Sequence, residues 1–326
     1  MGKTPEEGSL ENRAERVVNT RIIINSSIRR SKSKRIESAL RSQLAGTSVE
    51  TVRTAYAGHA TQIARRSAED GTDTVIVVGG DGTINEVVSG IWGSNIVLGI
   101  IPAGTANDIA CHYRIPKNVE HACRIIAARN TRRVDAISVN SWHYLATGGV
   151  GIPCDAIRFA EAFRRCWLLG WSPVILMGSL LYVWGLMCAL LRYSRWRHPL
   201  IVENGNQRWE VDAFSLTVGL FPTLGKHYKI LPGAAGHDGR MGICLIENCQ
   251  NPLRLLRSVF STLSGRHIGM ANVQTFRTTC LSVRSRRPIS LFGDGEIRPR
   301  STLFRMKHVP GVVNLIVPRR EQGELI

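Results

Sequence analysis

One pattern occurs twice between residues 74 and 110: a buried strand, a glycine-rich loop and a helix start. The first copy runs from the β-branched strand Thr74–Val78 into the loop Gly79–Thr83, and the second runs from Val97–Ile101 into the loop around Gly104. Strands without a polar break are typical of a parallel sheet that is covered on both faces. Glycines after such a strand let the backbone approach an anion, and the helix start offers unpaired N–H groups. Two such loops on neighbouring strands are expected to face one crevice, where open α/β sheets bind ligands.

The first loop is neither of two common phosphate motifs. No Lys follows Gly82, as the P-loop requires, and the glycine spacing differs from that of the dinucleotide fingerprint. A phosphate loop that contains a carboxylate, Asp81, calls for a cation, and magnesium is usually held by one or two carboxylates together with substrate phosphates. The residues therefore predict a nucleotide with magnesium. The alternative is a structural turn in which Asp81 caps the helix, and the tandem arrangement favours the functional interpretation.

These motifs resemble the diacylglycerol kinase catalytic-domain family, which includes bacterial lipid kinases and sphingosine kinases. The resemblance rests on Gly-Gly-Asp-Gly-Thr at Gly79–Thr83 with Glu86, on Pro-x-Gly-Thr-x-Asn-Asp at Pro102–Asp108, and on Asp-Gly-Glu at Asp294–Glu296. The first motif also occurs in NAD kinases and phosphofructokinases, whereas the second is much more specific. The resemblance covers nearly the whole chain, from about Arg21 to Val317.

The family and the alternating strands and helices imply an α/β plus β fold. We expect a Rossmann-like, NAD-kinase-like three-layer α/β domain at the N-terminus and a β-sandwich domain that builds the lipid side. The expected boundaries are a disordered tail at 1–16, a nucleotide-binding domain at 17–135, a β-sandwich at 136–310 with a helical insertion at 154–196, and a segment at 311–326 that returns to the first domain.

One stretch, Trp167–Leu191, carries no charge over about 25 residues, which is long enough to span a bilayer. Pro173, Gly178 and Gly185 interrupt it, and strand-like sequence follows at once. We expect a helix that packs on the β domain or contacts lipid rather than a true membrane span.

The resemblance assigns the binding of ATP to four places in the first domain. The residues are Asn25, Ser26, Ser27, Thr54, Gly79, Gly80, Asp81, Gly82, Thr83, Asn85, Glu86, Gly104, Thr105, Asn107 and Asp108. The loop Asn25–Ser27 lacks the Pro and the Gly that the family usually has there, and a helix N-cap is an equally good explanation of its serines.

The resemblance also implies magnesium at two places. Asp81 and Asp108 would organise the catalytic magnesium and the loop of Thr105, and Asp135 would belong to the same magnesium-centred network. A structural magnesium would be held by Asp238 and by the main-chain oxygens of Ala235 and Arg240.

A hydroxyl becomes a good nucleophile when a carboxylate within hydrogen-bond reach accepts its proton. Asp294 and Glu296 stand two apart on a tight turn, and residues two apart project to the same side of an extended chain, so both could reach one pocket. By resemblance this turn carries the base: Glu296 is the expected proton acceptor, and Asp294 is the close alternative. Taken alone, the turn would be read as structural.

A net charge of +17 indicates an anionic partner. No helix-turn-helix, zinc-finger or ribonucleoprotein motif is present, so nucleic acid is not expected, and the charge suits peripheral docking on an anionic membrane surface. The eight cysteines include no C-x-x-C pair, and residues 1–16 lack the apolar core of a signal peptide, which favours a cytoplasmic protein with reduced thiols. A homodimer is compatible with the sequence, which does not reveal the oligomeric state.

The predicted function is that of an ATP-dependent lipid kinase, which transfers the γ-phosphoryl group to a lipid hydroxyl of diacylglycerol or of a sphingoid or ceramide-like lipid. An NAD kinase-like phosphotransferase is the main enzyme alternative, and the Gly104–Asp108 motif weighs against it. A non-catalytic protein that binds lipid or nucleic acid is the alternative of a different class.

Overall fold

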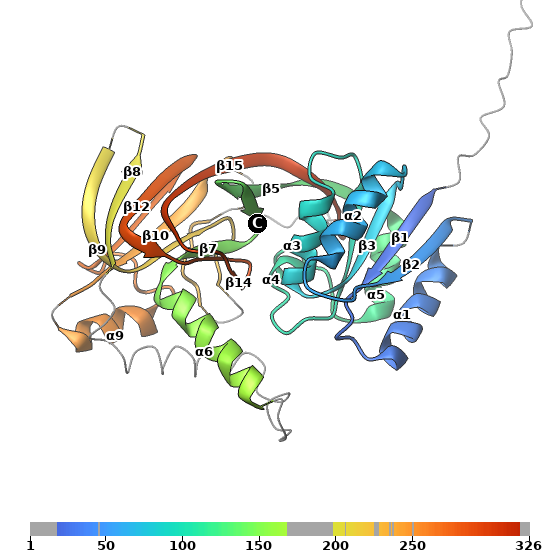
Figure 1. Ribbon diagram of the computed structural model, residues 1–326, viewed down its shortest axis with the longest axis horizontal. Coiled ribbons are helices and arrows are strands. Elements are labelled where there is room, and N and C mark those ends of the chain that lie inside the picture. The colour runs from blue at the N-terminus through green and yellow to red at the C-terminus, as the bar shows by residue number, and fades with distance from the viewer. Residues whose placement is uncertain are drawn as a thin grey trace, which may run out of the picture.

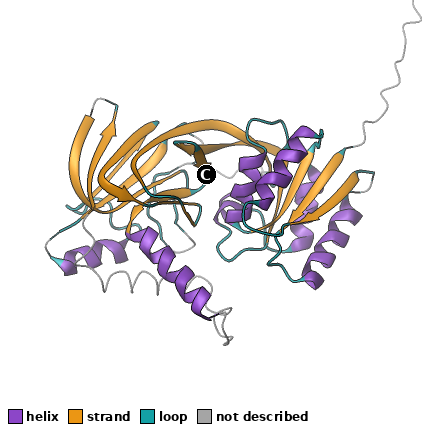
Figure 2. Cartoon of the chain, viewed as in Figure 1, coloured by secondary structure: helices purple, strands orange, loops and turns teal. Residues whose placement is uncertain are grey.

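The computed structural model describes residues 18–44, 46–167, 198–205, 207–224, 228–234, 236, 238–249 and 251–319. Two halves lie side by side, one with helices on both faces of a sheet and one rich in antiparallel strands (Figures 1 and 2). The tail predicted at 1–16 and most of the predicted helical insertion lie outside the described residues. No helix among the described residues has both the length and the apolar character that a membrane span needs.

The first half is a parallel sheet between two layers of helices, as predicted. Its elements are β1 (Asn19–Ile24), α1 (Arg30–Gln43), β2 (Ser48–Arg53), α2 (His59–Glu69), β3 (Thr74–Gly79), α3 (Asp81–Gly90), β4 (Val97–Pro102), α4 (Asp108–His112) and α5 (Val119–Ala128). The strand order is β4-β3-β1-β2. Helices α2 and α3 pack together on one face and α1 and α5 on the other, so all six residues of β3 are buried (Figure 1).

The second half is built mainly from antiparallel strands. Its elements are β5 (Thr131–Val139), β6 (Trp142–Tyr144), β7 (Thr147–Gly151), α6 (Ile152–Trp167), β8 (His198–Asn204), β9 (Gln207–Gly219), β10 (Met241–Glu247), α9 (Pro252–Ser261), β11 (Val273–Thr278), β12 (Cys280–Ile289), β13 (Leu291–Gly293), β14 (Glu296–Ile297) and β15 (Ser301–Ile316). Helices α6 and α9 lie on the same side of these strands (Figure 1). The β-sandwich predicted for this part of the chain is confirmed.

Strand β15 connects the two halves. It is antiparallel to β12 and β5, and its last residues run parallel to β4, with Asn314 opposite Val97. The strand predicted at 312–317 already begins at Ser301, because the charged residues of β15 alternate with buried ones and conceal a long, half-buried strand.

Asp135 binds β15 at the point where its pairing with β5 is interrupted. The register of β15 with β5 shifts between Val309 and Val313. There, one carboxylate oxygen of Asp135 accepts a hydrogen bond from the Gly311 N–H at 2.9 Å, and the other lies 2.9 Å from Nε2 of His308. The residue expected in a magnesium network therefore lies at the bend of the connecting strand.

Candidate active site

The two glycine loops meet at the carboxyl edge of the parallel sheet. Strands β3 and β4 are paired neighbours, with Gly79 opposite Pro102. A Cβ added to Gly104 would lie 2.4 Å from Cα of Gly80, which is closer than any side chain allows. A Cβ on Gly80 would lie 3.0 Å from Cα of Gly104, so glycine is needed at position 104 and favoured at position 80 for the close approach of the two backbones.

The start of α3 is open to an anion. Its N-cap residue is Gly80, and no side chain caps the helix. The N–H groups of Asp81, Gly82 and Thr83 belong to the first turn, which has no intrahelical acceptors. These amides and the positive end of the helix dipole form the kind of site that binds phosphate groups.

Asp81 caps a different helix from the one in which it lies. Its Oδ1 accepts a hydrogen bond from the N–H of Ile109 in α4 at 3.1 Å. Burial raises the pKa of Asp81, and backbone N–H groups at residues 107–109 oppose that rise. Asp81 is thus a capping aspartate, as the structural alternative proposed, but it caps α4 rather than its own helix α3. The same side chain also faces the crevice.

The second glycine loop is closed by its own asparagine. Asn107 has a φ of 55°, and its side chain accepts from the Gly104 N–H and donates to the Gly104 carbonyl, both at 2.8 Å. Its role here is to shape the loop. Thr105 and Asp108 line the crevice, so they remain in reach of a ligand.

The loop Asn25–Ser27 is tied to the first glycine loop. Nδ2 of Asn25 donates to Oγ1 of Thr83 at 2.6 Å, while its Oδ1 accepts from the N–H and the hydroxyl of Ser27. The Ser26 N–H donates to Oγ1 of Thr54 at 3.0 Å. The N-cap of α1 is Arg29, so neither serine caps that helix. The structure thus brings Asn25, Thr54 and Thr83 together.

Two residues predicted to contact the nucleotide face other parts of the protein. The Glu86 carboxylate accepts from the N–H groups of Gly58 and Ala60, at the start of α2. Asn85 is fully buried, and its amide donates to the His143 carbonyl at 3.3 Å and accepts from Nη2 of Arg298 at 3.1 Å. Neither lines the crevice, so both hold neighbouring elements in place.

The Asp294–Glu296 turn differs from the extended arrangement predicted for it. Asp294 and Gly295 have φ values of 50° and 82°, and Gly293 pairs with Glu296 across the hairpin of β13 and β14. This left-handed turn gives the two carboxylates different surroundings, although both line one cavity. The prediction that an extended backbone brings both carboxylates to one pocket is therefore wrong, because the backbone forms a left-handed turn there.

Asp294 is held inside the protein. Its Oδ2 accepts from the Leu145 N–H at 2.7 Å and its Oδ1 from the Ala146 N–H at 2.8 Å. Burial and, to a lesser extent, the negative charge of Asp81 raise the pKa of Asp294 to about 7, against the effect of the N–H donors. Both oxygens are engaged, which leaves this carboxylate poorly placed to accept a proton from a substrate.

Glu296 instead reaches the glycine loop of the first half. A Cβ added to Gly82 would lie 2.8 Å from Oε1 of Glu296. Its Oε2 lies 3.0 Å from Nη2 of Arg298, whose guanidinium stacks over Trp142 at 5.0 Å from the ring centroid. The carboxylate is therefore positioned beside the start of α3, where phosphate groups would bind.

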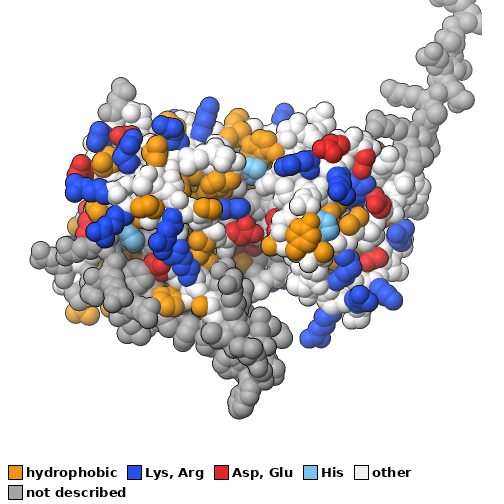
Figure 3. Space-filling view, in the orientation of Figure 1, with side chains coloured by type: hydrophobic (Ala, Val, Ile, Leu, Met, Phe, Trp, Pro, Cys, Tyr) orange, Lys and Arg blue, Asp and Glu red, His pale blue; other side chains and the backbone are white. Residues whose placement is uncertain are grey.

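A cavity of about 320 Å³ joins these groups to the interior of the second half. Four carboxylates line its polar end, namely those of Asp81, Asp108, Asp294 and Glu296. Figure 3 shows acidic side chains gathered in the hollow between the halves. The rest of the wall is mostly apolar and comes from several elements, including Ile152, Pro153, Ala156 and Ile157 of α6, Phe214 of β9, Ile246 of β10, Val259 of α9 and Phe292 of β13.

Of the predicted magnesium ligands, Asp81 and Asp108 line the cavity. Asp238 pairs with Arg277 and accepts from the Arg240 N–H at 3.3 Å, and Ala235 lies outside the described residues. The part of the chain that the structure describes contains no group of three His, Cys, Asp or Glu side chains arranged to hold a metal. However, the four carboxylates suit a magnesium ion that arrives with phosphates, because such ions need only one or two protein carboxylates.

Two kinds of site residue escape prediction from sequence. The apolar wall comes from elements far apart in the chain, and its residues look like ordinary core residues. Arg298 stands two residues after Glu296, just beyond the end of β14, and no motif of the sequence marks it.

Comparisons with known proteins agree with this architecture. The family model "Diacylglycerol kinase catalytic domain" matches residues 19–139, and "YegS C-terminal NAD kinase beta sandwich-like domain" matches residues 172–317. The chain is 28% identical to a "Probable lipid kinase YegS-like" of Yersinia enterocolitica, over 80% of this chain and 84% of that protein. It is 27% identical to a diacylglycerol kinase of Bacillus subtilis, over 86% of this chain and 89% of that protein. A solved diacylglycerol kinase structure from Bacillus anthracis, 18% identical, shares the fold with a TM-score of 0.68 over 93% of this chain and 98% of that one.

Proposed function

Since the chain belongs to the diacylglycerol kinase catalytic-domain family, we propose that it transfers the γ-phosphoryl group of ATP to the hydroxyl of a lipid. The proposed acceptor is diacylglycerol or a sphingoid or ceramide-like lipid. The observation that carries this proposal is the cavity, which is polar beside the start of α3 and apolar along α6, β9 and β10. An acyl chain fits the apolar part while its hydroxyl stays at the carboxylates.

The residues divide the reaction between the two halves. The start of α3 and Thr105 bind and orient the phosphates, and Glu296 accepts the proton of the lipid hydroxyl. Glu296 is preferred to Asp294 because both oxygens of Asp294 accept backbone hydrogen bonds. Asp81 and Asp108 would hold magnesium, which neutralises charge on the phosphates when it is bound.

The remaining alternatives predict different substrates. An NAD kinase-like enzyme needs polar contacts along the ribose and the pyrophosphate of its acceptor, whereas this cavity wall is mostly apolar. A non-catalytic lipid binder has no need of four carboxylates at the mouth of its pocket. Both observations favour the kinase.

The test uses purified protein with magnesium, labelled ATP and a panel of diacylglycerol, sphingoid base, ceramide and NAD. We expect transfer to a lipid, and we expect Ala156→Phe to raise the KM for that lipid about tenfold, because the ring enters the apolar part of the cavity, while the KM for ATP is unchanged. Ala128→Phe, on the exposed end of α5, is the matched control. Transfer to NAD alone would refute the lipid assignment, and no transfer with tight vesicle binding would favour the binder.

We also propose that α9 and the turn after it dock on an anionic bilayer. Four of the six exposed large hydrophobic side chains of the described residues lie there, namely Leu253, Phe260, Leu263 and Ile268. Residues 251–272 contain Arg254, Arg257 and Arg266 but no Asp or Glu, which suits an anionic surface. Val259 on the inner side of α9 lines the cavity, so docking would place the cavity next to the lipids.

Vesicle binding tests this docking surface. Leu253→Ser with Phe260→Ser is expected to weaken binding to phosphatidylglycerol vesicles at least about tenfold, because each apolar side chain loses about 1.5–3 kcal/mol of burial. Turnover of a short-chain, water-soluble diacylglycerol should stay near wild type. Tyr56→Ser, which removes a side chain that is 56% exposed in the first half, is the control. Vesicle binding of the double variant that equals wild type would contradict the assignment.

A further inference from the structure

A second cavity lies on the other face of α6. It has a volume of about 800 Å³. Cys154, Asp155, Arg158 and Phe159 line it, whereas the active-site cavity is lined by the alternate pairs of α6 residues, Ile152 with Pro153 and Ala156 with Ile157. Side chains three and four apart share a helix face, so α6 is a common wall of the two cavities.

Positive charge dominates this second cavity. Four arginines line it, Arg158, Arg286, Arg287 and Arg300, and Asp155 is the one acidic residue among its described lining residues. His198 also lines it, and burial lowers the pKa of this imidazole. Asp155 lies 3.6 Å from Arg158. The other three arginines have no ion pair with any described residue, so positive charge is in excess among the described groups that line the cavity.

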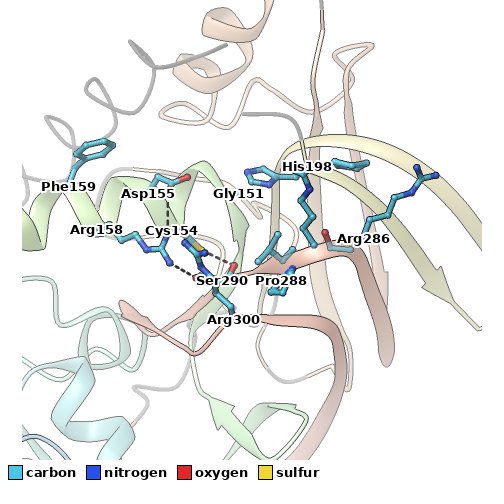
Figure 4. A pocket seen from close by; sticks show the side chains of 14 residues that line it. Gly151, Cys154, Asp155, Arg158, Phe159, His198, Arg286, Pro288, Ser290 and Arg300 are labelled. Carbon is cyan, nitrogen blue, oxygen red and sulfur yellow. Dashed lines mark hydrogen bonds and ion pairs between the residues drawn. The ribbon is translucent and has the colours of Figure 1, made fainter. Parts of the chain in front are cut away.

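Part of this cationic wall is preorganised. Arg158 is fixed between Asp155 and the hydroxyl of Ser290, to which it donates a hydrogen bond. Figure 4 shows Arg158 and Arg300 near Cys154 and Ser290 at one end of the cavity. Arg300 and His198 line the same cavity as Asp155.

Two further features point to a ligand. The register of β12 with β15 shifts between Arg284 and Ile289, so Arg286 and Arg287 lie where the regular pairing is interrupted. Nε2 of His198 is buried and has no hydrogen-bond partner among the described residues, which is costly unless another group satisfies it. Guanidinium groups bind phosphate oxygens through paired, charge-assisted hydrogen bonds.

We propose that this second cavity binds a phosphate ester. The ligand is either a free phosphate compound or the headgroup of a phospholipid, since both offer the same chemistry to the arginines. Because α6 also lines the active-site cavity, we expect occupancy to change the KM for the lipid acceptor more than that for ATP, and this consequence rests on the proposed function.

Binding is measured first without any turnover. The protein is titrated with inorganic phosphate and with glycerol 3-phosphate in a calorimeter, and is mixed separately with vesicles of phosphatidylglycerol or phosphatidylcholine. Arg286→Ser with Arg300→Ser removes two arginines that make no hydrogen bond or ion pair with a described residue. Arg41→Ser with Arg65→Ser makes the same change in net charge on exposed faces of α1 and α2 and serves as the control.

We expect the cavity variant to lose at least about tenfold in affinity while the control keeps wild-type affinity. If the cavity variant loses affinity for glycerol 3-phosphate, the ligand is a soluble phosphate compound. If it loses affinity only for phosphatidylglycerol vesicles, the ligand is a phospholipid headgroup. Equal binding by both variants in every arm overturns the proposal. These results do not depend on catalysis, so an absence of kinase activity would refute the proposed function and leave the phosphate site standing.

Discussion

Replacing Glu296 with Gln is expected to lower kcat about 10²- to 10⁴-fold, the range that a positioned general base contributes. The amide keeps the size of the side chain and its contact with Arg298, but it cannot accept a proton from the lipid hydroxyl. The KM values for ATP and lipid should change little, because the apolar wall and the start of α3 are untouched. Steady-state kinetics with the preferred lipid measure the effect.

The control is Glu203→Gln. Glu203 in β8 also lies beside an arginine, with Nε of Arg208 at 3.7 Å from its Oε1, but it does not line the cavity. Replacing the Glu203 carboxylate by an amide should leave kcat near the wild-type value. Full turnover by Glu296→Gln would show that Glu296 is not the proton acceptor, and Asp294 would then be the candidate.

Asp294 is expected to make stability fall as the pH rises from about 4 to about 7. Its folded-state pKa of about 7 lies above its ordinary value of 3.8, so the folded state holds the proton more tightly than the unfolded state. The favourable contribution is complete below pH 3.8 and is lost as the pH approaches the folded-state pKa. Its size is on the order of 4 kcal/mol, at about 1.4 kcal/mol per pKa unit.

Urea denaturation at several pH values between 4 and 7 measures this loss. Asp294→Asn should be less stable overall, because its amide group must face one of the N–H donors at Leu145 or Ala146, but its stability should vary less with pH over this window. Asp70→Asn is the control. Burial opposes ionisation of Asp70, but hydrogen bonds from Thr72 and Arg21 lower its pKa from 3.8, so its contribution is lost only as the pH falls below that value. Replacing Asp70 should therefore leave the slope between pH 4 and 7 unchanged. Identical slopes for wild type and Asp294→Asn would contradict the expectation.

Local patterns predicted the glycine loops and the strands before them, because a β-branched run such as Thr74–Val78 and the glycines after it determine their own conformation. The same patterns could not show which way each motif residue faces. Glu86 lies within the motif but caps α2, and Asn107 closes its own loop. These orientations depend on packing between elements rather than on spacing.

The acceptor side was predicted only as a domain. Its apolar wall is assembled from α6, β9, β10, α9 and β13, and no local pattern in any of these elements marks a pocket residue. The left-handed turn at Asp294 was concealed because Asp followed by Gly suits several turn types. The assigned binding residues and the domain boundaries stay predictions.

The pairing of β15 with β4 has a consequence for how the chain matures. Val97 can pair with Asn314 only after the chain has been synthesised as far as the end of β15. Until then the outer edge of β4 has no such partner, and an uncovered strand edge invites pairing with other chains. A nascent chain that has completed β1 to β4 therefore still has an unpaired strand edge at β4. Contacts between residues so distant in sequence also form slowly.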